Sequence, residues 1–244
     1  MAGARHHSPP SQLGRARKPG WIAVLAVGWA TGCALSPKPE PPDAVPTLDL
    51  EATSALPSNA DARPLSLVGG PGAVDPAGAT IRLYRLEGDE MVEATVDRDG
   101  SFLLEGVADD GDDVRVVVLT DDRRSAPVDL RMTATWGPIE AVTHPLADCL
   151  TLTPALELDL AERQTVEIRS TCEAPVTVVA PRTRVPWAEL QLGTDLSWPL
   201  TLNAGDSVSL TVTLSGPSSF EEEIFFVETT TPEPDQRAIT VRAP

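Results

Sequence analysis

The sequence contains few of the residues on which most catalytic and metal sites depend. Its 244 residues include three cysteines, three histidines and one tyrosine, and aromatic residues make up only 4% of the chain. Beyond residue 32 the sequence has a single histidine, His144. With one histidine, this part of the chain has few ligands for a zinc site and a single candidate base for a Ser–His or Cys–His catalytic pair. No G-x-S-x-G motif is present. These absences favour a protein that is not an enzyme and holds no cofactor or metal.

Two catalytic alternatives remain open. His144 precedes Pro145, where a solvated linker residue is the favoured interpretation and a catalytic or ligand role the less favoured one. Asp and Glu together number 36, so the paired acids of a glycoside hydrolase are possible by count alone. A sugar cleft of that kind is lined with aromatic side chains, however, and these are scarce here.

The sequence also lacks a hydrophobic run long enough to cross a membrane. A spanning helix needs about 20 apolar residues, whereas the run from Trp21 to Leu35 has 15. The residues before it carry four basic side chains and no acid, and the run closes on the small residues Ala30-Thr31-Gly32. A basic region, a short apolar core and small residues at its end are typical of a secretory signal peptide.

Ala30-Thr31-Gly32-Cys33 resembles the lipobox of bacterial lipoproteins, in which a small residue precedes the cysteine that becomes acylated. The resemblance implies a signal peptide over residues 1–32 and a lipid anchor on Cys33. The protein would then lie in the cell envelope, with the outer membrane as the favoured location. Two alternatives stay open: an ordinary signal peptide cut near Gly32 with an unmodified Cys33, or a short anchor that is not cleaved.

Positive charge is scarce in the remainder of the chain. Lysine occurs only at Lys18 and Lys38, and the formal net charge is −17. Loss of residues 1–32, with four basic residues and no acid, would take it to about −21. Such a surface repels phosphate backbones and anionic lipid, so no nucleic acid partner is expected. Contact with the membrane would depend on the acyl chains, and the remaining partner would be a protein or a glycan of the envelope.

Residues 33–64 are expected to form the acylated cysteine and a tether. Between Ala34 and Pro64 there are seven prolines, five acidic residues and few large apolar ones, so little of this stretch can be buried. The predicted tether is therefore disordered, acidic and proline-rich. In the alternative, the stretch TLDLEATSAL at 47–56 contributes an edge strand to the domain that follows.

The rest of the chain has the pattern of an all-β protein. No segment repeats apolar residues at helical spacing, whereas short alternating stretches are separated by turn residues. In residues 65–133, Ile81 and Leu83 alternate with Arg82 and Tyr84, and a hairpin is expected around Asp97-Arg98-Asp99-Gly100. The phrases G-x-G-A-V-x-P-A-G-A-T-I, D-x-D-G-S-F and S-A-P-V-x-L resemble bacterial Ig-like and carboxypeptidase-regulatory-like repeats. This implies a β-sandwich without an active site.

Residues 148–244 alternate more regularly, with Val208, Leu210, Val212 and Leu214 set against Ser and Thr. The order T-V-E-I-R-S-T-C-E-A-P-V-T-V followed by L-N-A-G-D-S-V-S-L-T-V-T-L is similar to Ig-like surface modules of the ASH and MSP type. It departs from them at Leu160-Ala161, where the family has Phe-Gly. The predicted fold is two Ig-like antiparallel β-sandwiches joined by a linker over 134–147, in which Trp136 packs at the junction.

Cysteine number predicts one disulfide. With Cys33 acylated, Cys149 and Cys172 remain, an even number, as expected in an oxidising compartment. The bond would tie the first strand of the second domain, or the approach to it, to the second strand. Free thiols are the less favoured state.

Three surface features have competing interpretations. Calcium binding is suggested by the loop aspartates Asp97, Asp99, Asp110 and Asp112, with Asp109 and Asp113 beside them, but turn-forming hydrogen bonds are favoured because only a fragment of an EF-hand loop is present. Trp187 and Trp198 could form a glycan platform, although core packing is the more common fate. The run Glu221-Glu222-Glu223 before IFFV is interpreted as charged residues that keep an aggregation-prone strand from associating with other chains.

The sequence as a whole favours a lipid-anchored envelope protein that acts as a non-catalytic structural or protein-binding module. A glycan-binding adhesin or an accessory module of a surface enzyme is the alternative. A calcium-dependent surface protein is the third.

Overall fold

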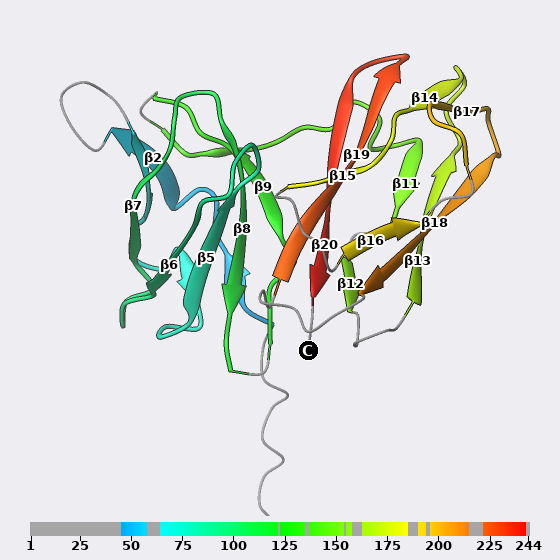
Figure 1. Ribbon diagram of the computed structural model, residues 1–244. Helices are drawn as coiled ribbons and strands as arrows, with labels where there is room; N and C mark the ends of the chain where they lie inside the picture. The colour runs from blue at the N-terminus through cyan, green and yellow to red at the C-terminus, as the bar shows by residue number, and fades with distance from the viewer. Residues whose placement is uncertain are drawn as a thin grey trace, which may run out of the picture. The chain divides into compact units, whose positions relative to one another are not determined.

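The computed structural model describes residues 45–57, 64–121, 123–134, 137–153, 155–157, 163–184, 190–193, 196–214 and 222–242. These residues form twenty strands and no helix (Figure 1). The predicted all-β class is therefore confirmed. The signal segment 1–32, Cys33, Trp136, Trp187 and the Leu160-Ala161 pair lie outside the described residues. No helix of the described part is long and apolar enough to span a membrane.

The first sandwich consists of strands β1 to β10. A five-stranded sheet in the order β10-β9-β8-β5-β6 faces a three-stranded sheet β2-β3-β7, and β1 pairs with β4. Ile81, Leu83, Val116 and Leu130 of one sheet and Leu67 of the other are buried in a single apolar cluster. The bounds are β1 Thr47–Leu48, β2 Thr53–Pro57, β3 Leu65–Gly69, β4 Val74–Asp75, β5 Thr80–Arg85, β6 Met91–Thr95, β7 Phe102–Ala108, β8 Asp113–Leu119, β9 Val128–Arg131 and β10 Glu140–Ala141.

The predicted tether over 33–64 is too long at its C-terminal end. Strand β2 pairs with β3 along its whole length, from Thr53 opposite Gly69 to Pro57 opposite Leu65. Ala55 is buried in the first core. The alternative of an edge strand in 47–56 is therefore confirmed: alternating small and apolar side chains suffice to cover one edge of a sheet, despite the high proline content nearby.

The predicted linker over 134–147 is likewise partly structured. Ile139 is buried in the first core, and β10 pairs with β9 through Glu140 opposite Arg131. Burial of the Ile139 side chain fixes this segment against the first sandwich, although the composition of the segment is that of a loop.

The turn Asp97–Gly100 is present, but the expected hairpin is not. The amide of Asp97 donates to the carbonyl of Ser101 over 2.8 Å, and Gly100 has a φ of 84°. A Cβ on Gly100 would lie 2.7 Å from the carbonyl oxygen of Val74, so only glycine fits. Strand β6 pairs with β5 and β7 pairs with β3. The chain thus crosses from one sheet to the other at this turn, with Val96 and Phe102 both buried in the core between the sheets.

The second sandwich consists of strands β11 to β20. Sheet β11-β13-β18-β16 faces sheet β12-β20-β19-β14-β17, in which β15 also pairs with β19. Leu210 and Val212 of β18 are buried, as their alternation predicts. The bounds are β11 Leu150–Leu152, β12 Ala155–Glu157, β13 Arg163–Ser170, β14 Val176–Val178, β15 Arg182–Thr183, β16 Leu190–Gly193, β17 Leu200–Leu202, β18 Ser207–Leu214, β19 Glu222–Thr231 and β20 Asp235–Arg242.

One strand pair departs from the predicted antiparallel arrangement. The chain leaves β11, which pairs with β13, and enters the other sheet as β12, where it runs parallel to β20. Residues 150–152 and 155–157 therefore belong to different sheets. A strand that changes sheets closes both edges of a sandwich with a single segment.

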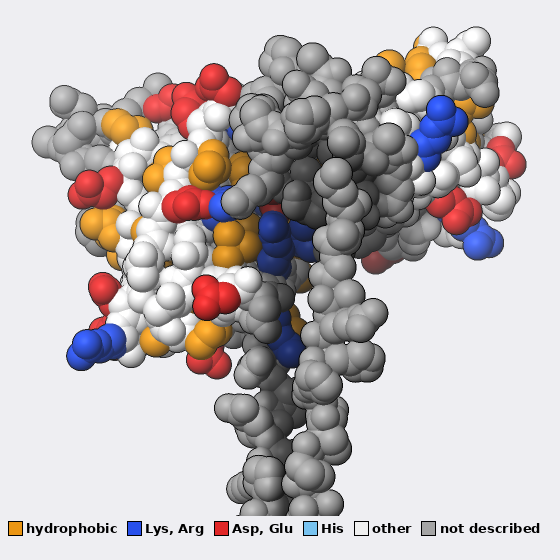
Figure 2. All heavy atoms as spheres, turned by 60° about the horizontal axis from the view of Figure 1, so that its bottom comes forward, with side chains coloured by type: hydrophobic (Ala, Val, Ile, Leu, Met, Phe, Trp, Pro, Cys, Tyr) orange, Lys and Arg blue, Asp and Glu red, His pale blue; other side chains and the backbone are white. Residues whose placement is uncertain are grey.

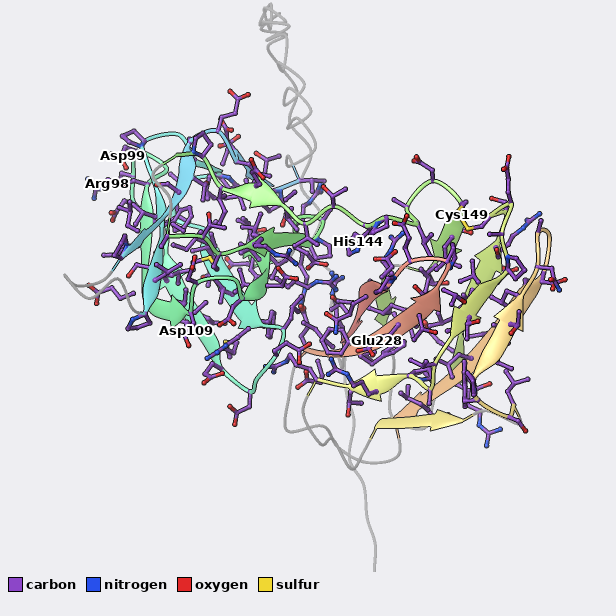
Figure 3. The ribbon with its side chains drawn as sticks, turned by 90° about the horizontal axis from the view of Figure 1, so that it is seen from above. Arg98, Asp99, Asp109, His144, Cys149 and Glu228 are labelled. Atoms are coloured by element: carbon purple, nitrogen blue, oxygen red, sulfur yellow. A yellow bond between two sulfur atoms is a disulfide. The ribbon has the colours of Figure 1, made fainter. Side chains whose placement is uncertain are left out.

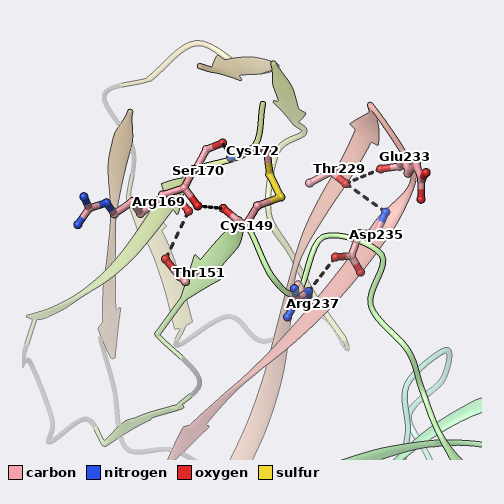
Figure 4. The surroundings of a disulfide bond; sticks show 10 residues. Cys149, Thr151, Arg169, Ser170, Cys172, Thr229, Glu233, Asp235 and Arg237 are labelled. Atoms are coloured by element: carbon pink, nitrogen blue, oxygen red, sulfur yellow. Dashed lines mark hydrogen bonds and ion pairs between the residues drawn. A yellow bond between two sulfur atoms is a disulfide. The ribbon is translucent and has the colours of Figure 1, made fainter. Parts of the chain in front are cut away.

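The predicted disulfide between Cys149 and Cys172 is present (Figure 4). Cys149 immediately precedes β11 and Cys172 follows β13, and the two Cα atoms are 4.7 Å apart. The amide of Thr171 donates to the carbonyl of Cys149 over 2.7 Å. The bond thus ties the start of the first strand to the end of its neighbour, as the sequence predicts.

Candidate functional site

The outer face of the five-stranded sheet is covered by β19 and β20. Tyr84, Leu86 and Val117 of the first sandwich form a buried apolar cluster with side chains of the second; its members there are Ile224, Phe226 and Ala238. Strand β5 therefore buries both faces, with Leu83 in the first core and Tyr84 in this third cluster. The term junction is used below for this cluster and for the polar contacts around it.

Arg115 is a buried cation that links the two sandwiches. Its side chain is 6% exposed. On one side it donates from Nε and Nη2 to the two carboxylate oxygens of Asp129, over 2.7 and 2.8 Å. On the other it donates to Thr240 Oγ1 over 2.9 Å and to the carbonyl of Ala238 over 2.7 Å. A bidentate guanidinium–carboxylate pair with further acceptors satisfies the charge that burial would otherwise penalise.

A second buried ion pair lies between Arg184 and Glu223, whose side chains are 4% and 0% exposed. Arg184 donates from Nε to Glu223 Oε1 over 2.8 Å and from Nη1 to the carbonyl of Gly88 over 2.9 Å. Its guanidinium also lies over the ring of Tyr84, 5.5 Å from the centroid. Gly88 and Tyr84 belong to the first sandwich, so this cation also joins the two.

The acidic residues at the start of β19 do not protect an exposed strand, contrary to the sequence interpretation. Glu222 and Glu223 are buried, and Glu221 lies outside the described residues. Glu222 pairs with Arg124 of the first sandwich and lies 3.6 Å from Arg242 of the second. The physical reason is that each carboxylate has an arginine partner at the junction, which offsets the cost of its burial.

His144 is held between two carboxylates and is not a loosely solvated linker residue. Its Nδ1 donates to Asp235 Oδ1 over 2.9 Å, and its Nε2 is 4.0 Å from Asp129 Oδ2. Asp235 also accepts from Arg237 Nε over 2.8 Å. Burial by itself would raise the pKa of Asp235, but the hydrogen bonds and charges of His144 and Arg237 outweigh it and hold that pKa below its ordinary value.

Two cavities meet at His144 and Asp129, which line both of them. The larger, of about 520 Å³, extends along Asp113, Arg131 and Glu228. The smaller, of about 430 Å³, extends along the opposite side, where Arg237 is among its lining residues. In the described part of the chain, the ion-pair partners of His144 are both carboxylates. The arrangement positions a histidine between acids and does not form a nucleophile–base pair.

Three of the four aspartates considered for calcium accept loop hydrogen bonds through their side chains. Asp99 Oδ1 accepts from the hydroxyl and the amide of Ser101, over 2.6 and 3.1 Å, and these bonds lower the pKa of Asp99. Asp112 accepts from the amide of Asp109 over 2.8 Å and pairs with Arg85. Asp110 accepts from the amide of Ala134 over 2.8 Å. Asp97 is exposed in the turn that Asp99 shares.

The structure does not bring these aspartates together as a metal site. Within the described ranges, no three side chains of His, Cys, Asp or Glu are grouped so that they could hold an ion. Figure 3 shows Asp99 and Asp109 on separate loops of the first sandwich. The turn-forming interpretation explains the contacts that are seen, and calcium binding stays a hypothesis without a supporting cluster.

Trp198 is partly buried and packs against the second core. Its proposed partner in a glycan platform, Trp187, lies outside the described residues, as does the acylation candidate Cys33. The platform and the lipid anchor therefore remain predictions from sequence.

Sequence reasoning missed the residues that make the junction, above all Arg115, Asp129, Arg184 and Asp235. A signal was present: DVRVVVL in β8 and EEIFFV in β19 are nearly continuous apolar runs. Such runs are typical of strands buried on both faces, whereas a surface strand alternates. From this pattern one could have expected the charged residues next to and within these runs to form ion pairs with one another.

Comparisons with known proteins identify no family. No protein-family model and no curated protein sequence matches the chain. Among solved structures, VesB protease of Vibrio cholerae has a TM-score of 0.34 at 14% identity, with 68% of this chain and 63% of that chain covered. The alpha-2-macroglobulin of E. coli has a TM-score of 0.30 at 11% identity, over 75% of this chain and 16% of that one. These similarities are too weak to carry an argument about function.

Proposed function

We propose that the protein is a lipid-anchored component of a bacterial cell envelope whose two sandwiches act as one non-catalytic unit that binds a protein partner. The supporting observation is the junction, where the buried cation Arg115 has its acceptors in both sandwiches. Two domains on a free hinge would expose these groups to water. A buried contact in which Arg115 is paired on both sides instead favours a single relative orientation.

The charges at the junction fix the relative orientation of the two sandwiches more than they add to the free energy of unfolding. Buried ion pairs recover little more than the cost of removing two charges from water. Their geometry is demanding, however, because displacing either partner leaves a charge unpaired. Arg115 and Arg184 each satisfy acceptors on both sides of the junction. A binding surface built from both sandwiches would then keep its shape.

The strand in 47–57 shortens the expected distance from the membrane. If Cys33 is acylated, eleven residues, 34–44, separate it from the first described residue. A chain of that length spans at most roughly 40 Å. The unit would thus stay close to the membrane surface, where a partner in the same membrane or the layer above it is within reach.

Intact-mass spectrometry tests the anchor. The wild type and Cys33→Ala, expressed in a bacterial host, should differ: the wild type begins at residue 33 and carries diacylglycerol and acyl mass, whereas the variant does not. An unmodified wild-type chain cut at another position would refute the lipid anchor.

Affinity capture from envelope membranes tests the single binding unit. Wild type and Arg115→Met are compared, with the exposed Arg98→Gln as matched control. A partner that needs both sandwiches should be captured by the wild type and the control and lost with Arg115→Met. Equal capture by all three proteins would show that the partner does not depend on the junction.

A further inference from the structure

Strand β6 is an open edge of the first sandwich. It ends the five-stranded sheet, and within the described part of the chain it pairs with β5 alone. Figure 1 shows β6 beside β7 at one side of the sandwich, where the chain crosses from one sheet to the other. An open edge presents backbone donors and acceptors with which an extended chain can pair as an added strand.

Two hydrogen bonds fix which backbone groups of β6 face β5. The amide of Arg85 donates to the carbonyl of Glu90 over 3.1 Å, and the amide of Val96 donates to the carbonyl of Ala79 over 2.8 Å. In an antiparallel ladder, hydrogen-bonded pairs of residues alternate with pairs that are not bonded. The even-numbered residues between Glu90 and Val96 therefore bond to β5.

The odd-numbered residues of β6 are Met91, Glu93 and Thr95, and their N–H and C=O groups point to the open side. No backbone hydrogen bond from the described residues reaches that side of the strand. The three residues are exposed, Met91 to 47%. The open side of β6 thus offers a donor and an acceptor at every second residue, which is the spacing that an added strand requires.

Strand β6 also lacks the features that protect other edges of this sandwich. Edges are commonly blocked by proline, by lysine or by a bulge. Strand β2 ends at Pro57, and β7 has a shift of register against β3 and a φ of 59° at Gly106. Strand β6, with the sequence MVEAT, contains neither proline nor lysine and keeps one register with β5 throughout. Its edge is therefore regular enough to accept a further strand.

The charges around β6 indicate which chain fits this edge. Residues 87–99 include six acidic residues and one basic residue, Arg98. At the left of Figure 2, acidic side chains of the first sandwich are interspersed with hydrophobic ones. A second copy that paired through β6 would bring these acids together, and like charges on facing strands are destabilising. A segment with basic side chains is complementary instead.

The side of β6 that faces the core is apolar. Val92 and Ala94 pack against the first core. A cavity of about 100 Å³ has Val92 and Val107 of β7 in its lining, with Arg85 and Glu90 beside them. Successive side chains of a strand point to opposite faces. An added strand would therefore place every second side chain against these apolar residues and the others among the exposed acids.

From these features we infer that β6 binds an extended segment of a protein partner in which apolar and basic residues alternate. The backbone of the segment hydrogen-bonds to Met91, Glu93 and Thr95. Its apolar side chains lie against Val92 and Ala94, and its basic side chains face the acids of residues 87–99. The inference rests on the protein partner of the proposed function, but it depends neither on the lipid anchor nor on the junction.

Hydrogen exchange of the full chain, measured by NMR with the peptide acetyl-Lys-Val-Lys-Val-Lys-Val-Lys-amide, tests the inference. Bound peptide should slow exchange of the amides of Met91, Glu93 and Thr95, because they gain acceptors. The amides of Val92 and Ala94 are already bonded to β5 and should change little. The same peptide with glutamate in place of lysine should bind at least about tenfold more weakly. No slowing, equal slowing of all five amides, or equal binding of the two peptides would overturn the inference.

Glu93→Pro removes one amide that points to the open side and leaves the bonds from β6 to β5 in place. Glu93→Gln is the matched control, because it removes the same charge and the same ion pair with Arg82 but keeps the amide. The proline variant should bind the lysine peptide at least about tenfold more weakly than the glutamine variant. Thr95→Pro, compared with Thr95→Ser, decides the matter if Glu93→Pro does not fold. Equal binding within either pair would overturn strand addition.

Affinity capture from envelope membranes separates this inference from the proposed function. Loss of the partner with Glu93→Pro but not with Glu93→Gln would support strand addition. If Arg115→Met loses the partner and Glu93→Pro retains it, strand addition is wrong and the two-sandwich unit stands. If Glu93→Pro loses the partner and Arg115→Met retains it, the unit is wrong and strand addition stands. Exchange at the three amides that slows with rising concentration of the protein alone would assign the edge to a second copy and overturn the choice of partner.

Discussion

The core of the second sandwich and the junction share one strand, β19, yet different interactions stabilise them. Phe225 points into a core of apolar side chains, whereas its neighbour Phe226 packs in the junction, where the guanidinium of Arg182 lies 4.4 Å from the centroid of its ring. The core depends on burial of apolar surface, which is non-directional. The junction adds paired charges, whose geometry is demanding. The difference explains how one sheet can both fold a domain and orient its neighbour.

The largest effect is expected from the core side of β19. Phe225 is fully buried, so Phe225→Ala should lower the free energy of unfolding by about 3–5 kcal/mol. Phe226→Ala, one residue along, should mainly weaken the junction and leave the second sandwich folded. Urea denaturation of both variants, followed by near-UV circular dichroism, measures the two losses. If Phe226→Ala unfolded the second sandwich as readily as Phe225→Ala, the core and the junction would not be separable.

The disulfide should stabilise the second sandwich directly and the first through the junction. It closes a loop with a sequence separation of 23, and in the chain-entropy model its removal costs about 3.4 kcal/mol. The double variant Cys149→Ala, Cys172→Ala should therefore lower the melting temperature of the single transition, and hydrogen exchange should become faster in β5 and β8 as well as in β13. Unchanged exchange in β5 and β8 would mean that the two sandwiches unfold separately.

Arg115→Met should separate the two sandwiches without unfolding either core. The variant leaves Asp129, whose side chain is 10% exposed, without its bidentate partner, which is expected to cost about 3 kcal/mol. Calorimetry should then resolve two transitions where the wild type shows one. Adding Asp129→Leu removes the unpaired carboxylate and should restore most of the loss. A single transition at the wild-type temperature would show that the cation does not hold the junction.

Acid should weaken the junction through Asp235. Its pKa is lowered in the folded protein, because the hydrogen bonds from His144 and Arg237 to the carboxylate outweigh the opposite effect of burial. The stability that these contacts contribute is fully present above the unfolded pKa near 3.8 and is lost as the pH falls through the lower, folded value. The melting temperatures of wild type and Asp235→Asn, measured from pH 5 to pH 2.5, should therefore converge as the solution is acidified. A constant difference over that range would contradict the assigned role.

Sequence patterns predicted the elements better than their pairing. Strand β18 and the disulfide follow from alternation and cysteine number. The crossing between sheets at Asp97–Gly100 did not follow, because a tight turn between two short strands has the same local sequence whether the strands pair or face each other. Strand β2 lies in a stretch whose prolines and acids predicted a tether, and only its pairing with β3 decides otherwise.

The candidate site was the least predictable part. His144 and Asp235 are 91 positions apart, and Arg115 and Thr240 are 125 apart. No local pattern connects residues at such separations, and without their partners each resembles a solvated charge.

The all-β class, the positions of regularly alternating strands such as β18 and the cysteine pair are therefore determined by the sequence itself, because they depend on local alternation, turn chemistry and simple number. Which strands share a sheet, and which charges become buried at the junction, only the tertiary structure decides. The physical reason is that an ion pair such as Arg115–Asp129 is acceptable inside a protein only when the surrounding strands supply every remaining acceptor.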